Sequence, residues 1–278
     1  MNKNIIITGA SGWISTELIK YLEKENYNIF KIDKKYFFNE LDRITSLNLD
    51  NIVFVHTAFP KPSYVNEVGA EKYKQDLNSN FAAVKKFLLN NKIESLVNFS
   101  SGSTYKLRKI DTDLYKPYSD QKLLEEKSFQ KLSVDRNFKL LNLKMFALLG
   151  KNVKNATPSS FSRIISDAKA SKKININSNP KLIVSVCYLE SLIELINKYI
   201  SDPNKKNYFI DAINININLG EFVELVSKKL KISERDIFFR NAHNVIENYV
   251  GNKNQYLKVL NSYNIENISI QEKIDQLI

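Results

Sequence analysis

The fold is decided by the opening stretch Asn4-Ile5-Ile6-Ile7-Thr8-Gly9-Ala10-Ser11-Gly12-Trp13-Ile14-Ser15. A buried strand runs into a glycine turn, and residues 17–22 then carry apolar side chains at helical spacing. A dinucleotide pyrophosphate needs this order, because glycines let the backbone approach the phosphates and the helix N-terminus receives their negative charge. The stretch therefore predicts a dinucleotide site lined by Gly9, Ser11, Gly12, Trp13 and Ile14.

An acidic residue ends the next predicted strand, residues 29–32. Asp33 comes about twenty residues after the first glycine, where a carboxylate accepts hydrogen bonds from the adenosine ribose hydroxyls. A carboxylate repels the 2′-phosphate of NADP, whereas the adjacent Lys34 and Lys35 could hold it. We interpret both lysines as solvated surface, so the sequence favours NAD but leaves NADP open. Ser15 replaces the third glycine of the fingerprint and is small enough to be tolerated there.

Length and composition narrow the class of protein. The chain has 278 residues, of which 43% are hydrophobic, enough for one large or two small domains. The single cysteine, Cys187, excludes a disulfide framework and fits a reducing compartment. No run approaches the ~20 apolar residues of a membrane span, and the N-terminus enters a strand without the apolar region of a signal peptide. We therefore expect a cytoplasmic protein with no membrane partner.

The net charge of +11 raises the question of a nucleic-acid partner. The lysines are scattered along the chain, and no basic block is interleaved with aromatic residues that could stack on bases. We therefore expect no nucleic-acid partner. The two histidines, His56 and His243, have no metal-ligand spacing with the one cysteine, so no metal site is predicted.

Strand and helix patterns alternate through the first half of the chain, which is typical of an α/β protein with a doubly wound parallel sheet. We expect a dinucleotide-binding Rossmann domain over residues 1–150. A smaller α/β substrate-binding lid is expected over 151–278, with a return strand near 208–213 that joins the main sheet. Helices are predicted over 67–91 and 118–132, the second after a loop that ends at Pro117. Residues 34–50 read as irregular, and 213–218 as a local alternation of Ile and Asn.

Three polar residues follow the ends of successive predicted strands, where ligands of such sheets bind. Ser101 follows the strand over 95–99, and Tyr118 and Lys122 stand four apart on one helix face. A tyrosine hydroxyl has a pKa near ~10, and a nearby ammonium favours its phenolate. Such a tyrosine can exchange a proton with a sugar hydroxyl while a nicotinamide exchanges hydride with the same carbon. Ser101 would bond the reacting oxygen.

These residues make the chain resemble the extended short-chain dehydrogenase/reductase family, in its branch of sugar-nucleotide epimerases, dehydratases and reductases. The matching residues are Thr8 to Ile14, His56 to Ala58, Asn80, Phe99 to Ser101, Tyr105, Tyr118 to Lys122, Leu143 to Phe146 and Gly150. Weaker likeness over 184–192 and 219–226 extends the resemblance along nearly the whole chain.

The family's roles carry over position by position. The resemblance implies that Tyr118 is the acid–base residue, that Lys122 holds the nicotinamide ribose and tunes Tyr118, and that Ser101 orients the substrate oxygen. It also implies that the remaining cofactor contacts come from Thr57, Ala58, Phe59, Asn80 and Phe146. His56 belongs to the family's cofactor loop and is expected to be structural.

Departures from the family pattern narrow the reaction. Gly102 and Ser103, beside the substrate, stand where family dehydratases carry an Asp-Glu pair, so we do not expect dehydration. The family's diphosphate-binding arginine is missing near Val184, and Arg163 and Lys181 are the candidates to replace it. The compact size resembles the family's 4-ketoreductases.

We therefore expect an NAD(P)-dependent reductase that transfers hydride to C4 of a nucleotide-activated 4-keto (deoxy) sugar, for a surface polysaccharide. One alternative is an NAD-dependent nucleotide-sugar epimerase that uses the same site. Another, from a different class, is a non-catalytic dinucleotide-binding regulator.

The resemblance also implies a homodimer through the two helices that carry Asn80 and Tyr118. The apolar residues available for such a seam are Phe81, Val84, Phe87, Leu88, Leu123, Leu124 and Phe129. Charged residues are depleted at interface cores, and Lys85, Lys86, Glu125, Glu126 and Lys127 interrupt both helix surfaces. The dimer is therefore possible only if the protein core leaves enough of the apolar set uncovered.

Overall fold

The computed structural model describes residues 3–105, 112–152, 160–240 and 246–278, and of residues 36, 112–115 and 160 only the backbone. The chain divides into two compact units. Of the described residues, the first unit contains 3–105, 112–144 and 196–209, and the second contains 145–152, 160–195, 210–240 and 246–278.

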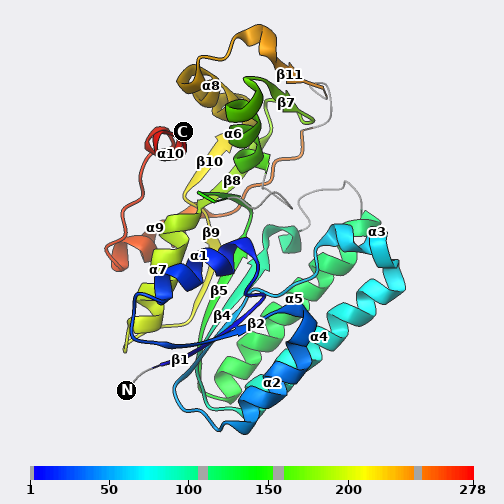
Figure 1. The fold of residues 1–278 in the computed structure, drawn as a ribbon, viewed down its shortest axis with the longest axis vertical. Coiled ribbons are helices and arrows are strands. Elements are labelled where there is room, and N and C mark those ends of the chain that lie inside the picture. Colours follow the sequence, from blue (N-terminus) through cyan, green and yellow to red (C-terminus); the bar gives the residue numbers. More distant parts are fainter. Residues whose placement is uncertain (1–2, 106–111, 153–159, 241–245) are drawn as a thin grey trace. The chain divides into compact units, whose positions relative to one another are not determined.

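Strands and helices alternate along the first unit (Figure 1). They are β1 (Asn4–Thr8), α1 (Trp13–Leu22), β2 (Asn28–Ile32), α2 (Phe37–Ser46), β3 (Ile52–His56), α3 (Val65–Val68), α4 (Ala70–Asn90), β4 (Ile93–Ser101) and α5 (Thr112–Asp135), with single 3-10 turns at Lys34–Tyr36, Pro62–Tyr64 and Gly102–Tyr105. Three elements continue from one unit into the other, namely β5 (Lys139–Met145), α7 (Leu189–Ser201) and β9 (Tyr208–Ala212).

The main sheet has six strands in the order β2-β1-β3-β4-β5-β9. β1 pairs in parallel with β2 and β3, and β3 pairs in parallel with β4. The predicted doubly wound α/β fold is therefore confirmed. β2 and β3 lie on opposite sides of β1, and such a switch point is where doubly wound sheets bind ligands. The register places Thr8 level with Ile32 and His56, so the chain leaves all three strands at one edge.

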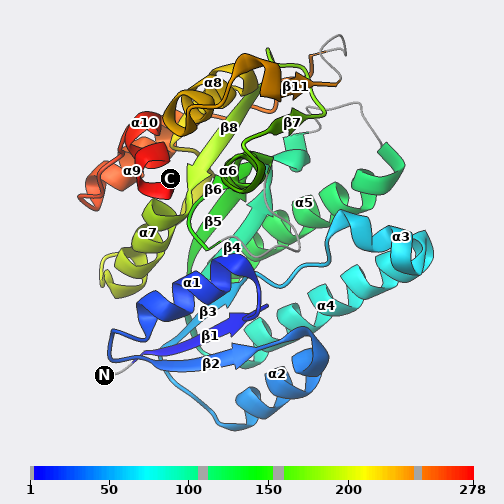
Figure 2. The same ribbon diagram turned by 45° about the horizontal axis from the view of Figure 1, so that its top comes forward.

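Helices cover both faces of this sheet, with α1 on one face and α2, α4 and α5 side by side on the other (Figures 1 and 2). Ile6, Phe54 and Leu96 pack beneath the three-helix layer against Phe87 and Phe129, and all five side chains are buried. The neighbours of these strand residues point to the opposite face, because side chains alternate along a strand. Burial on both faces explains why β1 and β3 are apolar at almost every position.

Three expectations about local structure were wrong, and one further strand had not been assigned. Residues 37–46 form α2 rather than an irregular stretch, because Phe37, Leu41 and Ile44 make a buried stripe at helical spacing. α5 begins at Thr112, not after Pro117, and accommodates that proline at the cost of one backbone hydrogen bond. The helix expected over 67–91 is split into α3 and α4 at Gly69, whose φ is +81°. Residues 215–218 form a strand.

The second unit is built on two small sheets. Its elements are β6 (Ala147–Leu149), α6 (Ser160–Ser171), β7 (Ile174–Ile176), β8 (Ile183–Tyr188), β10 (Ile215–Asn218), α8 (Leu219–Leu230), β11 (Ile237–Phe239), α9 (Lys253–Ser262) and α10 (Ile270–Leu277), with a 3-10 turn at Glu234–Asp236. β8 lies between β10 and β6, and β11 pairs with β7. Phe161 and Phe222 meet edge-on in its core, with 4.6 Å between ring centroids. Over the described part of the chain, no helix is long and apolar enough to cross a membrane.

Candidate active site

The glycine turn after β1 lies directly against the loop that follows β3. Gly9 has a φ of +68°, and a Cβ at this position would come within 2.9 Å of the Ala58 backbone and the Thr57 hydroxyl. Gly12 donates its N–H to the Gly9 carbonyl at 2.9 Å and is the N-cap of α1. Gly9 is therefore required both by backbone conformation and by close approach.

Buried hydroxyl groups connect the turn to its neighbours. Thr57 Oγ1 donates to the Thr8 carbonyl at 2.6 Å, and Ser15 Oγ lies 2.6 Å from Thr57 Oγ1. Because the Thr57 proton is already donated to Thr8, Ser15 is the donor in the second bond. Ser15 is fully buried in α1. The serine at the third glycine position thus adds a hydrogen bond between α1 and the loop after β3.

His56 is part of the same polar core. Its Nδ1 lies 2.9 Å from Thr8 Oγ1, and its ring stacks on Phe54 and meets Phe129 edge-on. Burial, with a smaller contribution from the charge of Lys122, lowers the pKa of His56 to about 3. The imidazole is therefore neutral at physiological pH, in an arrangement suited to holding β1 and β3 together.

Asp33 and Lys34 stand at the carboxyl end of β2, beside the turn. Asp33 Oδ1 accepts the Ser11 N–H at 2.9 Å, which ties the end of β2 to the tip of the turn. The Lys34 ammonium lies 4.1 Å from the centroid of the Tyr64 ring, a cation–π contact. The acidic side chain is thus fixed to the turn, whereas the lysine is directed toward an aromatic ring.

These residues fit a dinucleotide. The first turn of α1 contains no acidic residue, so no fixed negative charge opposes a phosphate at the helix N-terminus. A Cβ on Gly12 would approach only the Gly9 carbonyl among the described atoms, at 3.1 Å, so the backbone is uncovered where a pyrophosphate would lie. Asp33 follows β2, the strand that pairs with β1, and an acid at this position can accept hydrogen bonds from the ribose hydroxyls.

Tyr118 lies on α5, against the loop that follows β3. Its ring meets the Phe59 ring edge-on, with 5.1 Å between centroids. Tyr73, fully buried on α4, donates its hydroxyl to the Pro60 carbonyl at 3.1 Å, which holds this loop in place. Burial raises the pKa of Tyr73, so its phenol stays protonated as a donor. Phe59, which the sequence placed along the cofactor, is thus part of the support of Tyr118.

Lys122 lies one turn further along α5 and is 3% exposed. Its ammonium donates to the Phe99 carbonyl at 2.8 Å and to Glu125 Oε2 at 3.3 Å, and sits 3.6 Å from the centroid of the Phe59 ring. Glu125 was expected on the helix surface, but it is only 2% exposed. The sequence contained the signal for its burial, because Tyr118, Lys122, Glu125 and Phe129 follow helical spacing along one face.

Ser101 ends β4 and begins the 3-10 turn that follows it. Its Oγ accepts the Ser103 N–H at 3.2 Å, and its carbonyl accepts from the Thr104 hydroxyl at 2.9 Å. The Ser101 hydroxyl proton is not used in either bond. The Ser103 hydroxyl oxygen is buried and has no hydrogen-bond partner within the described residues. Gly102, between them, is also buried.

The first unit therefore brings together the glycine turn, Asp33, Thr57 to Phe59, Ser101 to Ser103, Tyr118 and Lys122. Asn80 is half-buried in the middle of α4. The other three predicted residues belong to the second unit. Phe146 packs on Tyr249 at 4.9 Å between centroids, Arg163 pairs with Asp167 at 3.2 Å on the exposed face of α6, and Lys181 is exposed. Their contribution to the site stays a prediction.

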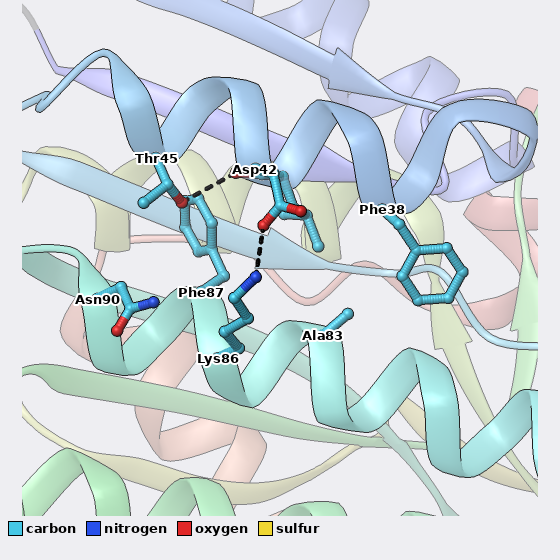
Figure 3. A pocket seen from close by; sticks show the side chains of 8 residues that line it. Phe38, Asp42, Thr45, Ala83, Lys86, Phe87 and Asn90 are labelled. Carbon is cyan, nitrogen blue, oxygen red and sulfur yellow. Dashed lines mark hydrogen bonds and ion pairs between the residues drawn. The ribbon is translucent and has the colours of Figure 1, made fainter.

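A cavity of about 100 Å³ between α2 and α4 lies apart from these residues (Figure 3). Its lining consists of Phe38, Leu41, Asp42, Thr45, Ala83, Lys86, Phe87 and Asn90. Lys86 pairs with Asp42 at 2.9 Å across it, and the Thr45 hydroxyl donates to the Leu41 carbonyl. None of the predicted site residues lines this cavity, and its charged groups satisfy each other.

A family model described as the NAD dependent epimerase/dehydratase family matches residues 5–215. The chain belongs to this family. It is accordingly an NAD(P)-dependent oxidoreductase or epimerase, as the sequence predicted. The match covers the whole glycine turn, Ser101, Tyr118 and Lys122, and ends at the start of β10.

Three solved structures of similar fold are named as nucleotide-sugar 4-epimerases. A UDP-N-acetylglucosamine 4-epimerase from Methanobrevibacter ruminantium, in complex with UDP-N-acetylmuramic acid, matches with a TM-score of 0.76 at 16% identity, over 98% of this chain and 96% of its own. A UDP-glucuronic acid 4-epimerase from Bacillus cereus, with UDP-glucuronic acid and NAD, gives 0.73 at 16% identity over the same shares. A UDP-glucose 4-epimerase from Thermotoga maritima gives 0.76 at 12% identity, again over 98% and 96%. A search of curated protein sequences finds no match.

Proposed function

We propose that the protein is an NAD-dependent 4-epimerase of a nucleotide-activated sugar. The observation that carries the proposal is the gathering of Tyr118, Lys122 and Ser101 in the same unit as a dinucleotide-type glycine turn, past the ends of neighbouring strands. Support for epimerisation at C4 comes from the three structures described above, all named as 4-epimerases of UDP-sugars. We keep the cytoplasm as its expected location, on the sequence argument alone.

The reductase expected from the sequence rested partly on the compact size of the chain. That argument does not separate the two activities, because the 4-epimerase structures align over 96% of their own length and 98% of this chain. The reductase of a 4-keto sugar remains the second candidate, since it would use the same tyrosine, lysine and serine. The epimerase and the reductase differ in the fate of the cofactor: an epimerase retains it, whereas a reductase must exchange it after each reaction.

Each residue has a distinct task in the proposed reaction. The Tyr118 phenolate takes the proton of the C4 hydroxyl and later returns it. The Lys122 ammonium favours the phenolate and donates to the nicotinamide ribose. Ser101, whose Oγ already accepts the Ser103 N–H, keeps its own proton to donate to the reacting oxygen. NAD, when bound, would supply the hydride carrier, which would take hydride from C4 and return it to the opposite face of that carbon. The Ser103 hydroxyl, which is buried and has no hydrogen-bond partner within the described residues, would bond a substrate hydroxyl.

The cofactor preference is proposed to be NAD over NADP. Asp33 is hydrogen-bonded to the glycine turn, whereas the Lys34 ammonium lies against the Tyr64 ring. The carboxylate is therefore nearer to where the adenosine ribose would bind, and it would repel a 2′-phosphate. Asp33→Ala should weaken NAD binding and narrow the preference for NAD over NADP. If the wild type instead binds NADPH preferentially, and Lys34→Ala with Lys35→Ala removes that preference, the lysines determine the choice.

The direct experiment offers purified protein UDP-glucose, UDP-N-acetylglucosamine and UDP-glucuronic acid separately and follows each anomeric proton by NMR. A 4-epimerase converts one of these sugars to its C4 epimer with no net consumption of the nicotinamide cofactor. A parallel assay offers nucleotide 4-keto sugars with NADH or NADPH and follows absorbance at the nicotinamide band. Stoichiometric loss of NADH or NADPH in that assay, with no epimer in the first, would replace the epimerase by the reductase.

A homodimer through α4 and α5 is also proposed, but on fewer residues than the sequence suggested. Val84, Phe87, Leu88 and Phe129 belong to the core beneath these helices and cannot reach a partner. Among the side chains that the structure describes on α4 and α5, the large apolar residues left exposed are Leu89, Leu124 and Val134, at 38%, 45% and 73%. Light scattering should give twice the 32.2 kDa chain mass. A single 32.2 kDa species at micromolar concentration would reject the dimer.

A further inference from the structure

The Lys122 ammonium donates two hydrogen bonds within the described residues, one to the Phe99 carbonyl on β4 and one to Glu125 on α5. The Phe59 ring, from the loop after β3, lies 3.6 Å from the ammonium and takes up no hydrogen bond, so the third N–H remains to donate to a ligand. The lysine and the glutamate are 3% and 2% exposed. Water therefore contributes little to either charge, and the direction of the ammonium is set by these three groups.

Burial works against both charges of the pair, because it lowers the pKa of Lys122 and raises the pKa of Glu125. The contact between the two opposes both shifts, and Glu125 is the largest influence that raises the pKa of Lys122. Glu126 raises it as well but is itself bonded to Ser100 and paired with Lys144 at 3.4 Å. His56 faces the lysine from β3 and is neutral. β4 contributes only the Phe99 carbonyl, and the loop after β3 contributes the uncharged Phe59, so Glu125 is the counter-charge of Lys122.

We propose that Glu125 is a positioning residue that keeps Lys122 protonated and aimed as the donor to the nicotinamide ribose of NAD. This inference rests on the proposed function, because it assumes that the dinucleotide reaches Lys122. It assigns different tasks to two adjacent acids of α5. Glu125 serves the lysine of the site, whereas Glu126 joins the ends of β4 and β5 through Ser100 and Lys144.

The test uses the intrinsic fluorescence of Trp13, which is the single tryptophan of the chain and lies at the start of α1 in the glycine turn. Titration with NAD between pH 6 and pH 10 gives the dissociation constant without requiring a sugar substrate. Wild-type affinity should fall at the pH where Lys122 loses its proton. Glu125→Gln introduces a neutral side chain of the same shape. In this variant the midpoint pH of the fall in NAD affinity should be lower than in wild type by about one unit or more. Above that midpoint the NAD dissociation constant should rise about tenfold.

Two controls separate this effect from damage to the fold. ADP lacks the nicotinamide ribose, so its affinity should be the same in wild type and Glu125→Gln. Asp135→Asn removes the same charge from the exposed end of α5 and should follow the wild-type pH dependence with NAD. Glu125→Asp retains the charge on a shorter side chain and should give an intermediate shift, which keeps the test valid if Glu125→Gln fails to fold.

The outcomes distinguish the inference from the proposed function. NAD affinity that falls at the same pH in wild type, Glu125→Gln and Glu125→Asp, while Lys122→Met binds NAD poorly, would overturn the role of Glu125 alone. If the folded wild type binds NAD no more tightly than ADP, the nicotinamide half contributes no affinity. That result would reject the proposed function and the inference together.

Discussion

The glycine turn and the α5 face are stabilised by opposite kinds of chemistry. Beneath the turn, neutral groups bond one another, namely Ser15 to Thr57, Thr57 to the Thr8 carbonyl, and Thr8 to His56, whereas the Asp33 carboxylate bonds the turn only at its exposed tip. On α5, two buried charges, Lys122 and Glu125, hold the position beside Tyr118. The dinucleotide phosphates bring their own charge to the turn, whereas proton transfer at Tyr118 requires a charge supplied by the protein.

This difference has a consequence for tolerance to change. Neutral hydrogen bonds can be lost one at a time at modest cost, of about 1 kcal/mol each. A buried charge that loses its partner is far more costly, because the remaining charge has neither water nor a counter-ion. We therefore expect changes on α5 to affect function most, and changes around the turn to affect stability in graded steps.

The largest effect is expected from Tyr118→Phe. The change keeps the ring that packs on Phe59 and removes the hydroxyl that carries the proton, so turnover should fall roughly a hundredfold or more. NAD affinity measured through Trp13 should be nearly unchanged. Turnover within a fewfold of wild type would show that the charged face of α5 is not the catalytic face.

Gly9→Ala tests whether the turn depends on shape rather than on charge. Alanine must adopt a φ of +68° and place its methyl group about 2.9 Å from the Ala58 backbone. Backbone strain alone should lower the free energy of unfolding by roughly 1–3 kcal/mol, and the clash with Ala58 should lower it further. NAD binding should be lost. The matched control is Gly69→Ala, also at positive φ but with open space around it. Equal stability losses in the two variants would mean that the contact with Ala58 contributes nothing.

The neutrality of His56 makes the turn sensitive to acid. Its pKa of about 3 in the folded protein lies below the usual 6.5, so the unfolded chain binds the extra proton between these values. The stabilisation is complete above pH 6.5 and is lost as the pH falls toward 3. Between pH 7.5 and pH 5 this one group should cost about 2 kcal/mol.

Urea unfolding of wild type and His56→Gln at both pH values measures that cost. The variant should be less stable than wild type at pH 7.5, because it loses the packing of the ring against Phe54 and Phe129, but it should lose less on acidification. An identical pH dependence in the two proteins would mean that His56 takes up its proton as readily in the folded protein as in the unfolded chain.

The smallest effect is expected from Ser15→Ala, which removes one neutral hydrogen bond from the turn. The loss in the free energy of unfolding should be about 1 kcal/mol, the usual net contribution of a buried hydrogen bond. Ser46→Ala, which removes a hydroxyl on the exposed end of α2, is the control and should change stability by less. A Ser15→Ala variant as stable as that control would mean that the serine only fills space.

The order of elements and the edge of the sheet where the site lies could be predicted from the sequence. Apolar runs and glycines report directly on burial and on backbone conformation, so the strand, the turn and Asp33 were recognisable as a unit. Helix boundaries near Pro117 and Gly69 were less accessible, because one residue can either end a helix or be accommodated within it, depending on what the neighbouring turns pack against.

The sequence by itself determined the doubly wound α/β fold, the glycine turn and the spacing of Tyr118 and Lys122, because these depend on local pattern and chain order. Tertiary structure alone decided which polar residues meet across elements. Glu125 shares a helix face with Lys122 in the sequence pattern, but only the packing of α5 on β4 buries the pair, and Ser15 reads as a tolerated replacement until the loop after β3 brings Thr57 to it. The strength of both contacts depends on burial that is complete only when separate elements pack together.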